Sequence, residues 1–181
     1  MANALTALRL VLVLPFVFFM ANGDSRSAAA ALIIWVVGLT TDLLDGPVAR
    51  RRGTVRAIGR TFDHATDFLF VTSGIAAGAW RGALPWILPI CITAAFVQYV
   101  IDSYWIQLRA GLRASMLGRY NGMFYFVPPC MDALIRLGVG FLRPLLRVLV
   151  WVLVVSTIVS MLQRLAYRRL SEDLASRSPQ K

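Results

Sequence analysis

Long apolar runs recur from one end of the chain to the other. Hydrophobic residues make up 58% of its 181 residues, and the mean hydropathy is +0.67, whereas a soluble domain is about 45–50% apolar. Six runs each approach the ~20 residues that a helix needs to cross a bilayer. They cover residues 4–21, 28–47, 62–80, 84–107, 119–137 and 143–165. The sequence therefore predicts an all-α integral membrane protein with six transmembrane helices.

The two ends of the chain differ in character. Residues 5–20 are apolar and Ala21-Asn22-Gly23 follows, which also fits a cleaved signal peptide. No charge precedes this run and Arg9 interrupts it, so we expect an uncleaved first span. Residues 168–181 are polar. We expect a single transmembrane domain over residues 1–167 and a short, disordered polar tail over residues 168–181.

Basic residues lie beside the apolar runs, and they are distributed unevenly between the two sides of the membrane that these runs would cross. Six spans put both termini and the loop between the second and third spans on one side. That side holds thirteen basic residues, and the other holds five, with Arg9 left aside. Positively charged loops stay in the cytoplasm, so we expect both termini and this loop to be cytoplasmic. Arg136, Arg143 and Arg147 depart from the rule. The net charge of +10 thus reflects membrane sidedness, and we expect no nucleic-acid partner.

Four aspartates lie where the second and third apolar runs meet the loop between them. Asp42 and Asp45 are three residues apart, and Asp63 and Asp67 are four apart, so each pair occupies one face of a helix. Carboxylates this close together repel one another unless cations lie between them. Hard divalent cations with oxygen ligands are the natural partners, and two ions bridged by shared carboxylates suit four acids.

Small residues continue both acidic faces. Gly46 and Ala49 extend the first face at helical spacing, and Gly59 precedes the second. A face without large side chains lets a bulky ligand approach the backbone, and Arg50 adds a planar cation suited to phosphate. This set describes a site for a metal-bound diphosphate. The alternative is that the aspartates only form ion pairs with Arg50–Arg60, which fits one aspartate better than four at these spacings.

These residues form one pattern, which we call the acidic motif. It reads Asp42-x2-Asp45-Gly46-x2-Ala49-Arg50-x8-Gly59-x3-Asp63-x3-Asp67. It resembles, at every fixed position, the signature of the CDP-alcohol phosphotransferase (phosphatidyltransferase) family. The start, Asn3-x2-Thr6-x2-Arg9 followed by Pro15, resembles the phosphatidylglycerophosphate and cardiolipin synthase-like branch. The chain length and six spans also resemble small bacterial members, so the resemblance covers most of the chain.

The resemblance implies a role for each position of the motif. Two Mg²⁺ or Mn²⁺ ions would be held by Asp42, Asp45, Asp63 and Asp67. Asp67 would also be the general base that takes the proton of the acceptor alcohol. The CDP-lipid would be bound by Asn3, Thr6, Asp42, Gly46, Ala49, Arg50 and Gly59. Family members are commonly dimers, so the resemblance implies a homodimer.

The implied reaction is transfer of a phosphatidyl group from CDP-diacylglycerol to an alcohol, with release of CMP. It would occur in a polar cavity facing the cytoplasm, in the bacterial inner membrane. The acceptor we expect is glycerol 3-phosphate, with Arg113 and Arg119 binding its phosphate. Anchoring at the cytoplasmic surface explains these two arginines equally well. Inositol phosphate, phosphatidylglycerol, serine or a different CDP-alcohol donor are the alternatives within the family.

Two other classes of function stay open. A divalent-cation transporter would place acids near mid-membrane, whereas the motif aspartates lie at the cytoplasmic ends of the spans. An inactive lipid-binding protein of the same fold would be expected to lack motif acids, and here none is missing. Outside the motif, His64 lies one step off the acidic face and favours a structural role. Gly74 and Gly78 form a small-xxx-small step that permits close helix packing.

Overall fold

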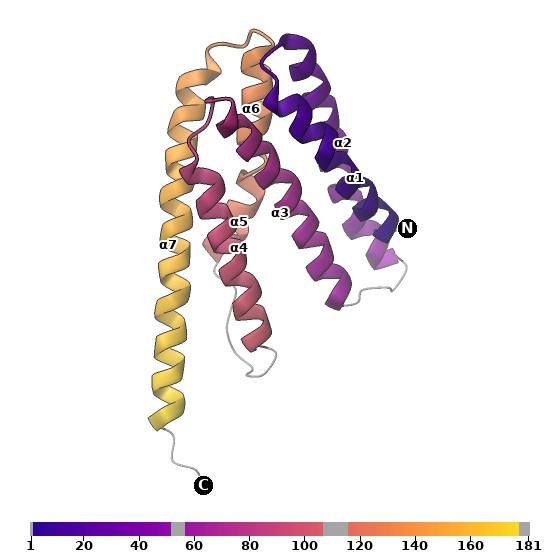
Figure 1. The fold of residues 1–181 in the computed structure, drawn as a ribbon. Coiled ribbons are helices and arrows are strands. Elements are labelled where there is room, and N and C mark those ends of the chain that lie inside the picture. The colour runs from indigo at the N-terminus through magenta and orange to yellow at the C-terminus, as the bar shows by residue number, and fades with distance from the viewer. Residues whose placement is uncertain (1, 52–56, 107–115, 178–181) are drawn as a thin grey trace.

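The computed structural model describes residues 2–51, 57–106 and 116–177. Within these ranges, side chains are described for residues 6–41, 64–102, 117–118 and 120–167. All regular structure in the described part is α-helical. The helices are α1 (Ala2–Ala21), α2 (Ser25–Arg51), α3 (Ala57–Trp80), α4 (Ile87–Ile106), α5 (Met116–Phe124), α6 (Val127–Arg136) and α7 (Leu142–Arg177). They form one elongated bundle (Figure 1).

The chain passes along the bundle six times, as the apolar runs predicted. Only Tyr125 and Phe126 separate α5 from α6, so these two helices together make the fifth pass. α2 ends at Arg51 and α3 begins at Ala57 at the lower end of the bundle in Figure 1. We call this the motif end. The α1–α2, α3–α4 and α6–α7 connections lie at the opposite end.

Local sequence signals explain the connections at that opposite end. Asp24 precedes α2, and its carboxylate accepts bonds from the backbone N–H and the hydroxyl of Ser27, at 2.8 and 2.7 Å. These bonds cap the helix and lower the pKa of Asp24. Gly82 and Gly138 have φ of +81° and +106°, and each follows a helix whose last carbonyls accept the two bonds of a Schellman motif.

Two boundaries differ from the expected spans. The run 119–137 is broken between α5 and α6, because Pro128 and Pro129 lack the N–H groups that a continuous helix needs. The indole of Trp35 on α2 donates to the Phe126 carbonyl at 2.9 Å and ties this break to the bundle. α7 continues to Arg177, although we expected a disordered tail from residue 168. Arginine, leucine, glutamate and alanine in this segment favour a helix.

α1 packs between α2 and α3 through two aromatic rings. Phe16 and Phe70 are both buried and stack with their centroids 4.4 Å apart. Glycines make room for them: a Cβ at Gly74 would lie 2.2 Å from the Phe16 ring, and one at Gly38 would lie 2.8 Å from the Phe70 ring. Gly78 in turn faces Leu84, whose nearest atom would lie 3.0 Å from a Cβ there. The close helix packing predicted at the Gly74–Gly78 step is thus found at Gly74, whereas the space at Gly78 is filled by the turn after α3.

A charged cluster ties the helices together at the end opposite the motif. The buried carboxylate of Asp132 accepts a bond from Arg81 at 2.5 Å and lies 3.4 Å from Nε of Arg136. Arg136 also donates to the carbonyls of Phe19 and Asn22, at 3.1 and 2.6 Å, where α1 ends. Arg136 was one of the arginines that departed from the charge rule. Its charge is engaged inside the protein, which explains the departure.

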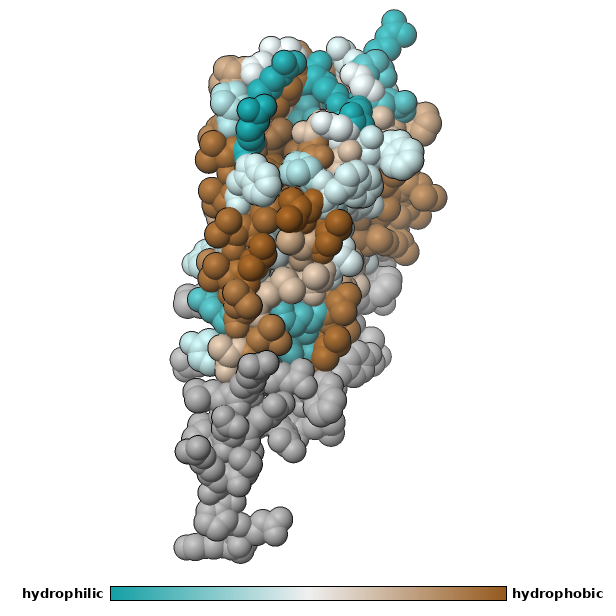
Figure 2. All heavy atoms as spheres, turned by 60° about the vertical axis from the view of Figure 1, so that its left-hand side comes forward, coloured by the Kyte–Doolittle hydropathy of each residue, from teal (hydrophilic) through white to brown (hydrophobic). Residues whose placement is uncertain are grey.

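The outside of the bundle is strongly apolar. Leu14, Ile33 and Val148 are 78%, 65% and 61% exposed, and brown apolar side chains cover most of the middle of the face in Figure 2. In the described part, one segment is both long and apolar enough to cross a bilayer, Leu142–Tyr167, with a mean hydropathy of 2.4. Shorter apolar helical segments are Thr6–Ala21, Ser25–Thr41 and Ile87–Asp102. An all-helical bundle with this exterior is consistent with a membrane protein.

Candidate functional site

The acidic motif is divided between two helices, whose motif-bearing turns both lie at the motif end. Asp42, Asp45, Gly46, Ala49 and Arg50 lie on the last turns of α2, and Gly59, Asp63 and Asp67 lie on the first turns of α3. Both halves therefore lie at one end of the bundle, together with the N-terminal turn of α1 (Figure 1). Among the motif aspartates, the described side chains include Asp67 alone.

Several predicted site residues lie outside the description. Asn3 is on α1 and Arg119 is on α5, but their side chains are not among those described. Arg113 lies outside the described residues altogether. The described side chains contain no group of three His, Cys, Asp or Glu residues that would hold a metal ion. The proposed roles of Asn3, Arg113 and Arg119 therefore stay predictions. The donor set itself, four carboxylates at the motif end of two helices, has the chemistry that a hard divalent cation prefers.

Asp67 forms an ion pair with Arg9 of α1. The Arg9 side chain is fully buried, and that of Asp67 is 21% exposed. Thr6, one turn before Arg9, is buried as well. A buried charge is costly unless it is paired, so the pair holds the Asp67 carboxylate in a fixed direction. This role of Arg9 was not predicted from the sequence, although a charge within an apolar run was the available signal.

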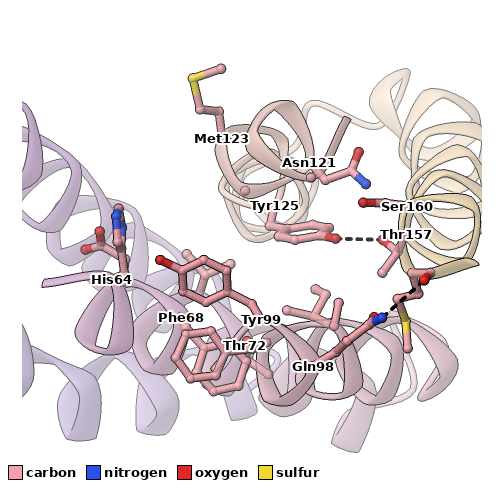
Figure 3. A pocket seen from close by; sticks show the side chains of 18 of the residues that line it. His64, Phe68, Thr72, Gln98, Tyr99, Asn121, Met123, Tyr125, Thr157 and Ser160 are labelled. Carbon is pink, nitrogen blue, oxygen red and sulfur yellow. Dashed lines mark hydrogen bonds between the residues drawn. The ribbon is translucent and has the colours of Figure 1, made fainter. Parts of the chain in front are cut away.

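A cavity of about 510 Å³ lies beside Asp67, lined by α3, α4, α5 and α7. This volume is within the range of about 300–1,000 Å³ that is usual for ligand sites. Asp67 lines it together with His64, and Figure 3 shows His64 across the cavity from Asn121 and Tyr125. The last acid of the motif therefore faces a space large enough for a small substrate.

Aromatic side chains line the cavity between His64 on one side and Asn121 and Tyr125 on the other. The rings of Phe68 and Phe96 stack with their centroids 4.0 Å apart. The rings of His64 and Tyr99 are arranged edge to face, with their centroids 6.4 Å apart. The Arg164 guanidinium of α7 lies 5.6 Å from the centre of the Tyr99 ring, a cation–π distance. Rings and guanidinium together fix the shape of the cavity near Asp67.

The far wall is polar. The Tyr125 hydroxyl and the Thr157 Oγ1 lie 2.6 Å apart, and the Ser156 hydroxyl donates to Oδ1 of Asn121 at 2.7 Å. Ser160, one turn further along α7, also lines the cavity. These residues were not predicted as site residues. Their signal was the helical spacing of hydroxyl groups within an apolar run, which is visible only once α5 and α7 are known to be neighbours.

The chain was compared with known proteins. Residues 1–160 match the family model described as CDP-alcohol phosphatidyltransferase. "Probable phosphatidylglycerophosphate synthase" of Mycobacterium tuberculosis (strain CDC 1551 / Oshkosh) is 33% identical over 95 residues, which are 51% of this chain and 46% of that protein. "Cardiolipin synthase (CMP-forming)" of Streptomyces coelicolor is 33% identical over 72 residues, 40% of this chain and 34% of that protein. The matches span less than half the length of these curated relatives.

Proposed function

The chain belongs to the CDP-alcohol phosphatidyltransferase family, and on this premise we propose that it transfers a phosphatidyl group from CDP-diacylglycerol to an alcohol and releases CMP. The observation that carries the proposal is the position of Asp67, the last acid of the motif, on the wall of a cavity of about 510 Å³. The relatives named as phospholipid synthases support a role in phospholipid biosynthesis. Of the acceptors, we favour glycerol 3-phosphate, in line with the synthase from Mycobacterium tuberculosis.

In this proposal the motif binds the donor and its metal ions. Divalent ions, Mg²⁺ or Mn²⁺, would be held by Asp42, Asp45, Asp63 and Asp67, and when bound they neutralise the diphosphate and make CMP a better leaving group. The CDP group would lie against the small residues of the motif, with Arg50 as a further phosphate partner. Asn3 and Thr6 would reach it from α1. The burial of Thr6 beside the Arg9–Asp67 pair supports a place for α1 in this site.

Asp67 would act on the acceptor alcohol. Its carboxylate accepts the proton of the acceptor hydroxyl while that oxygen attacks the phosphorus that carries the lipid. The bond from this phosphorus to the CMP oxygen breaks, CMP leaves, and a phosphodiester lipid forms. Arg9, which is paired with this carboxylate, keeps it oriented. Arg113 and Arg119 would bind the phosphate of the acceptor.

We propose that the bundle crosses a bacterial inner membrane six times, with the cavity, the motif end and both termini on the cytoplasmic side. The apolar exterior and the excess of basic residues at the motif end support this orientation. From the resemblance we also propose a homodimer, which cross-linking in native membranes would test. A reporter fused after Lys181 should give a cytoplasmic signal, and a periplasmic signal would overturn the orientation.

The activity is tested by CMP release from CDP-diacylglycerol. The purified protein is supplied with Mg²⁺ or Mn²⁺ and one acceptor at a time: glycerol 3-phosphate, inositol phosphate, phosphatidylglycerol or serine. We expect release with glycerol 3-phosphate, its loss on chelation with EDTA, and its return on adding the metal. Phosphatidylglycerol is the second candidate acceptor, because one relative is a cardiolipin synthase. Release with none of the four, from a sample that still binds CDP-diacylglycerol, would contradict the proposed reaction.

A further inference from the structure

The two helices of the fifth pass are held to very different degrees. In the described part of the chain, α5 packs mainly against α7 and touches α6 with its last turn. Its outer side is exposed: Tyr120, Met123 and Phe124 are 50%, 58% and 50% exposed. α6, by contrast, packs against α2, α3 and α7, and its Asp132 joins two arginines. α6 is therefore fixed in the bundle, whereas α5 leans on one neighbour.

The junction between α5 and α6 has the properties of a hinge. In a continuous helix, the carbonyls of Phe124 and Tyr125 would accept from the N–H groups four residues later. Those positions are Pro128 and Pro129, which have no N–H to donate. A change of angle here therefore costs no hydrogen bond at these two carbonyls. The bond from α2 to the Phe126 carbonyl at 2.9 Å holds the α6 side of the junction in place.

A chain of hydrogen bonds holds α5 against α7. The Ser156 hydroxyl donates to Oδ1 of Asn121 at 2.7 Å, and the Asn121 side chain also bonds to the Tyr125 hydroxyl. Thr157 donates to the Leu153 carbonyl at 2.6 Å. The Tyr125 hydroxyl is therefore the donor in its bond to Thr157 at 2.6 Å, which Figure 3 shows. We call Asn121, Tyr125, Ser156 and Thr157 the latch.

The latch can open without leaving buried polar atoms unpaired. Thr157 already bonds to a carbonyl one turn back on α7, and Ser156 can do the same, as hydroxyl residues in helices often do. Asn121 and Tyr125 line the cavity, where water can replace their partners on α7. Opening exchanges hydrogen bonds instead of losing them, so the closed and open positions of α5 are close in free energy.

We propose that α5 is a hinged gate, which swings away from α7 about Tyr125 and Phe126 and opens the cavity sideways toward the lipid. α5 has nine residues and is about 14 Å long, so a turn of about 20° moves its first residue by about 5 Å. A molecule with apolar tails could then keep them in the bilayer while its polar head enters or leaves the cavity. This use of the gate rests on the proposed function, whereas the movement itself does not.

The first measurement follows the movement without turnover. Cys91→Ala and Cys130→Ala provide a background without cysteine, and Tyr120→Cys on α5 and Val155→Cys on α7 carry spin labels at exposed positions. Pulsed electron paramagnetic resonance in lipid nanodiscs should show two label-to-label distances, one for each position of α5. The control pair, Val97→Cys on α4 with Val155→Cys, should show one distance, because α4 packs along α7.

Latch variants test what holds the gate closed. Asn121→Leu and Tyr125→Phe remove latch bonds at nearly constant volume, so each should raise the share of the longer distance about threefold or more. Tyr167→Phe removes an exposed hydroxyl elsewhere on α7 and should leave that share unchanged. A single distance in the unmodified protein and in both latch variants would overturn the gate.

The second measurement locks the gate. In the same background, Asn121→Cys and Ser156→Cys are joined through disulfides by a short reagent with two thiol-reactive ends. Joining should lower CMP release at least about tenfold, because a closed gate stops exchange of substrate and product. Reduction should restore the release, and the reagent should change it less than about twofold in either single-cysteine variant. Full turnover with the two helices joined would overturn the gate.

The two measurements separate the gate from the proposed reaction. Two distances that respond to the latch variants, in a protein that releases no CMP with any acceptor, would contradict the reaction and leave the gate standing. CMP release by a protein that shows one distance in every variant would leave the reaction standing and remove the gate.

Discussion

Arg9 and Asp67 are 58 residues apart in the chain and meet where α1 lies against α3. Neither charge is stable alone in such an apolar setting, because an unpaired buried ion loses its hydration without compensation. α1 therefore contributes more than a hydrophobic surface: it supplies the cation that balances the last acid of the motif. The Asp67 carboxylate is held against α1 on one side and faces the cavity on the other.

Replacing Arg9 tests this balance. Arg9→Met should destabilise the protein by up to about 3 kcal/mol, because it leaves Asp67 without its buried partner. Adding Asp67→Asn to Arg9→Met should recover part of the loss, since the two effects are coupled. Thermal unfolding in detergent measures both variants, with Arg9→Lys as the charge-retaining control. Simple additivity of the two substitutions would contradict the pairing.

The role of Asp67 differs from that of the other aspartates in the proposed reaction. Asp67→Asn should lower kcat by at least about 100-fold, the usual contribution of a general base, and should spare CDP-diacylglycerol binding better than Asp42→Asn does. Asp42 is proposed to bind the CDP-lipid as well as the metal ions, so Asp42→Asn should weaken CDP-diacylglycerol binding more. Turnover and binding are measured on the same preparations. Equal loss of binding in the two variants would make Asp67 mainly a metal ligand.

The acidic motif was readable from the sequence because its residues lie within 26 consecutive positions. The residues that surround Asp67 in the fold could not be predicted from the sequence. Arg9 comes from another helix, and Gln98, Asn121 and Thr157 line the cavity from three more. Each looks like an isolated polar residue in an apolar run. Only the packing of α3 against α1 and α4, and of α5 against α7, brings them together.

At the scale of elements, glycines decide how closely the helices approach. The Phe16 ring occupies the space where Gly74 has no side chain, so α1 and α3 come close along this face. The six passes and most of their boundaries followed from the apolar runs and from the turn residues at Gly23, Gly82 and Gly138. The break at Pro128 and the extension of α7 to Arg177 did not, since hydropathy alone does not report where a helix pauses or how far a polar segment continues it.

Gly74→Ala is the sharpest test of this packing. The new Cβ would lie 2.2 Å from the Phe16 ring, so the ring or the helix must move, at a cost of about 1–3 kcal/mol. Gly140→Ala is the matched control, because a Cβ at Gly140 meets nothing within 4 Å. Thermal unfolding should show a lower melting temperature for Gly74→Ala only. A Gly74→Ala protein as stable as the control would show that Phe16 relaxes freely.

At the scale of the whole molecule, the two ends of the bundle have different tasks. The motif end carries the acidic motif, together with Arg50, Arg51 and Arg60 on the ends of α2 and α3. The opposite end carries Asp132, which engages both Arg81 and Arg136 and so links α6 to the α3–α4 connection and to the last turn of α1. This network fixes the relative positions of the helices from the far side, away from the cavity.

Asp132→Asn should therefore affect stability more than chemistry. Removing the shared carboxylate leaves two arginines without their anion, and we expect a loss of about 3 kcal/mol or more. CMP release per folded molecule should stay within about twofold, because the cavity is lined by other residues. Melting temperature and activity are compared on the same sample. Lost activity in a protein of unchanged stability would instead connect Asp132 to the reaction.

The Arg9–Asp67 pair has a consequence for biogenesis. A ribosome delivers α1 before α3, so Arg9 is synthesised long before its anion exists. In the membrane orientation proposed above, a lone arginine in the first helix would be expensive in lipid. α1 can insert stably only after α3 has been synthesised and Asp67 lies beside Arg9. Stable insertion of the N-terminus and assembly of the reactive centre would then be a single event, and a chain truncated before α3 would be left for degradation.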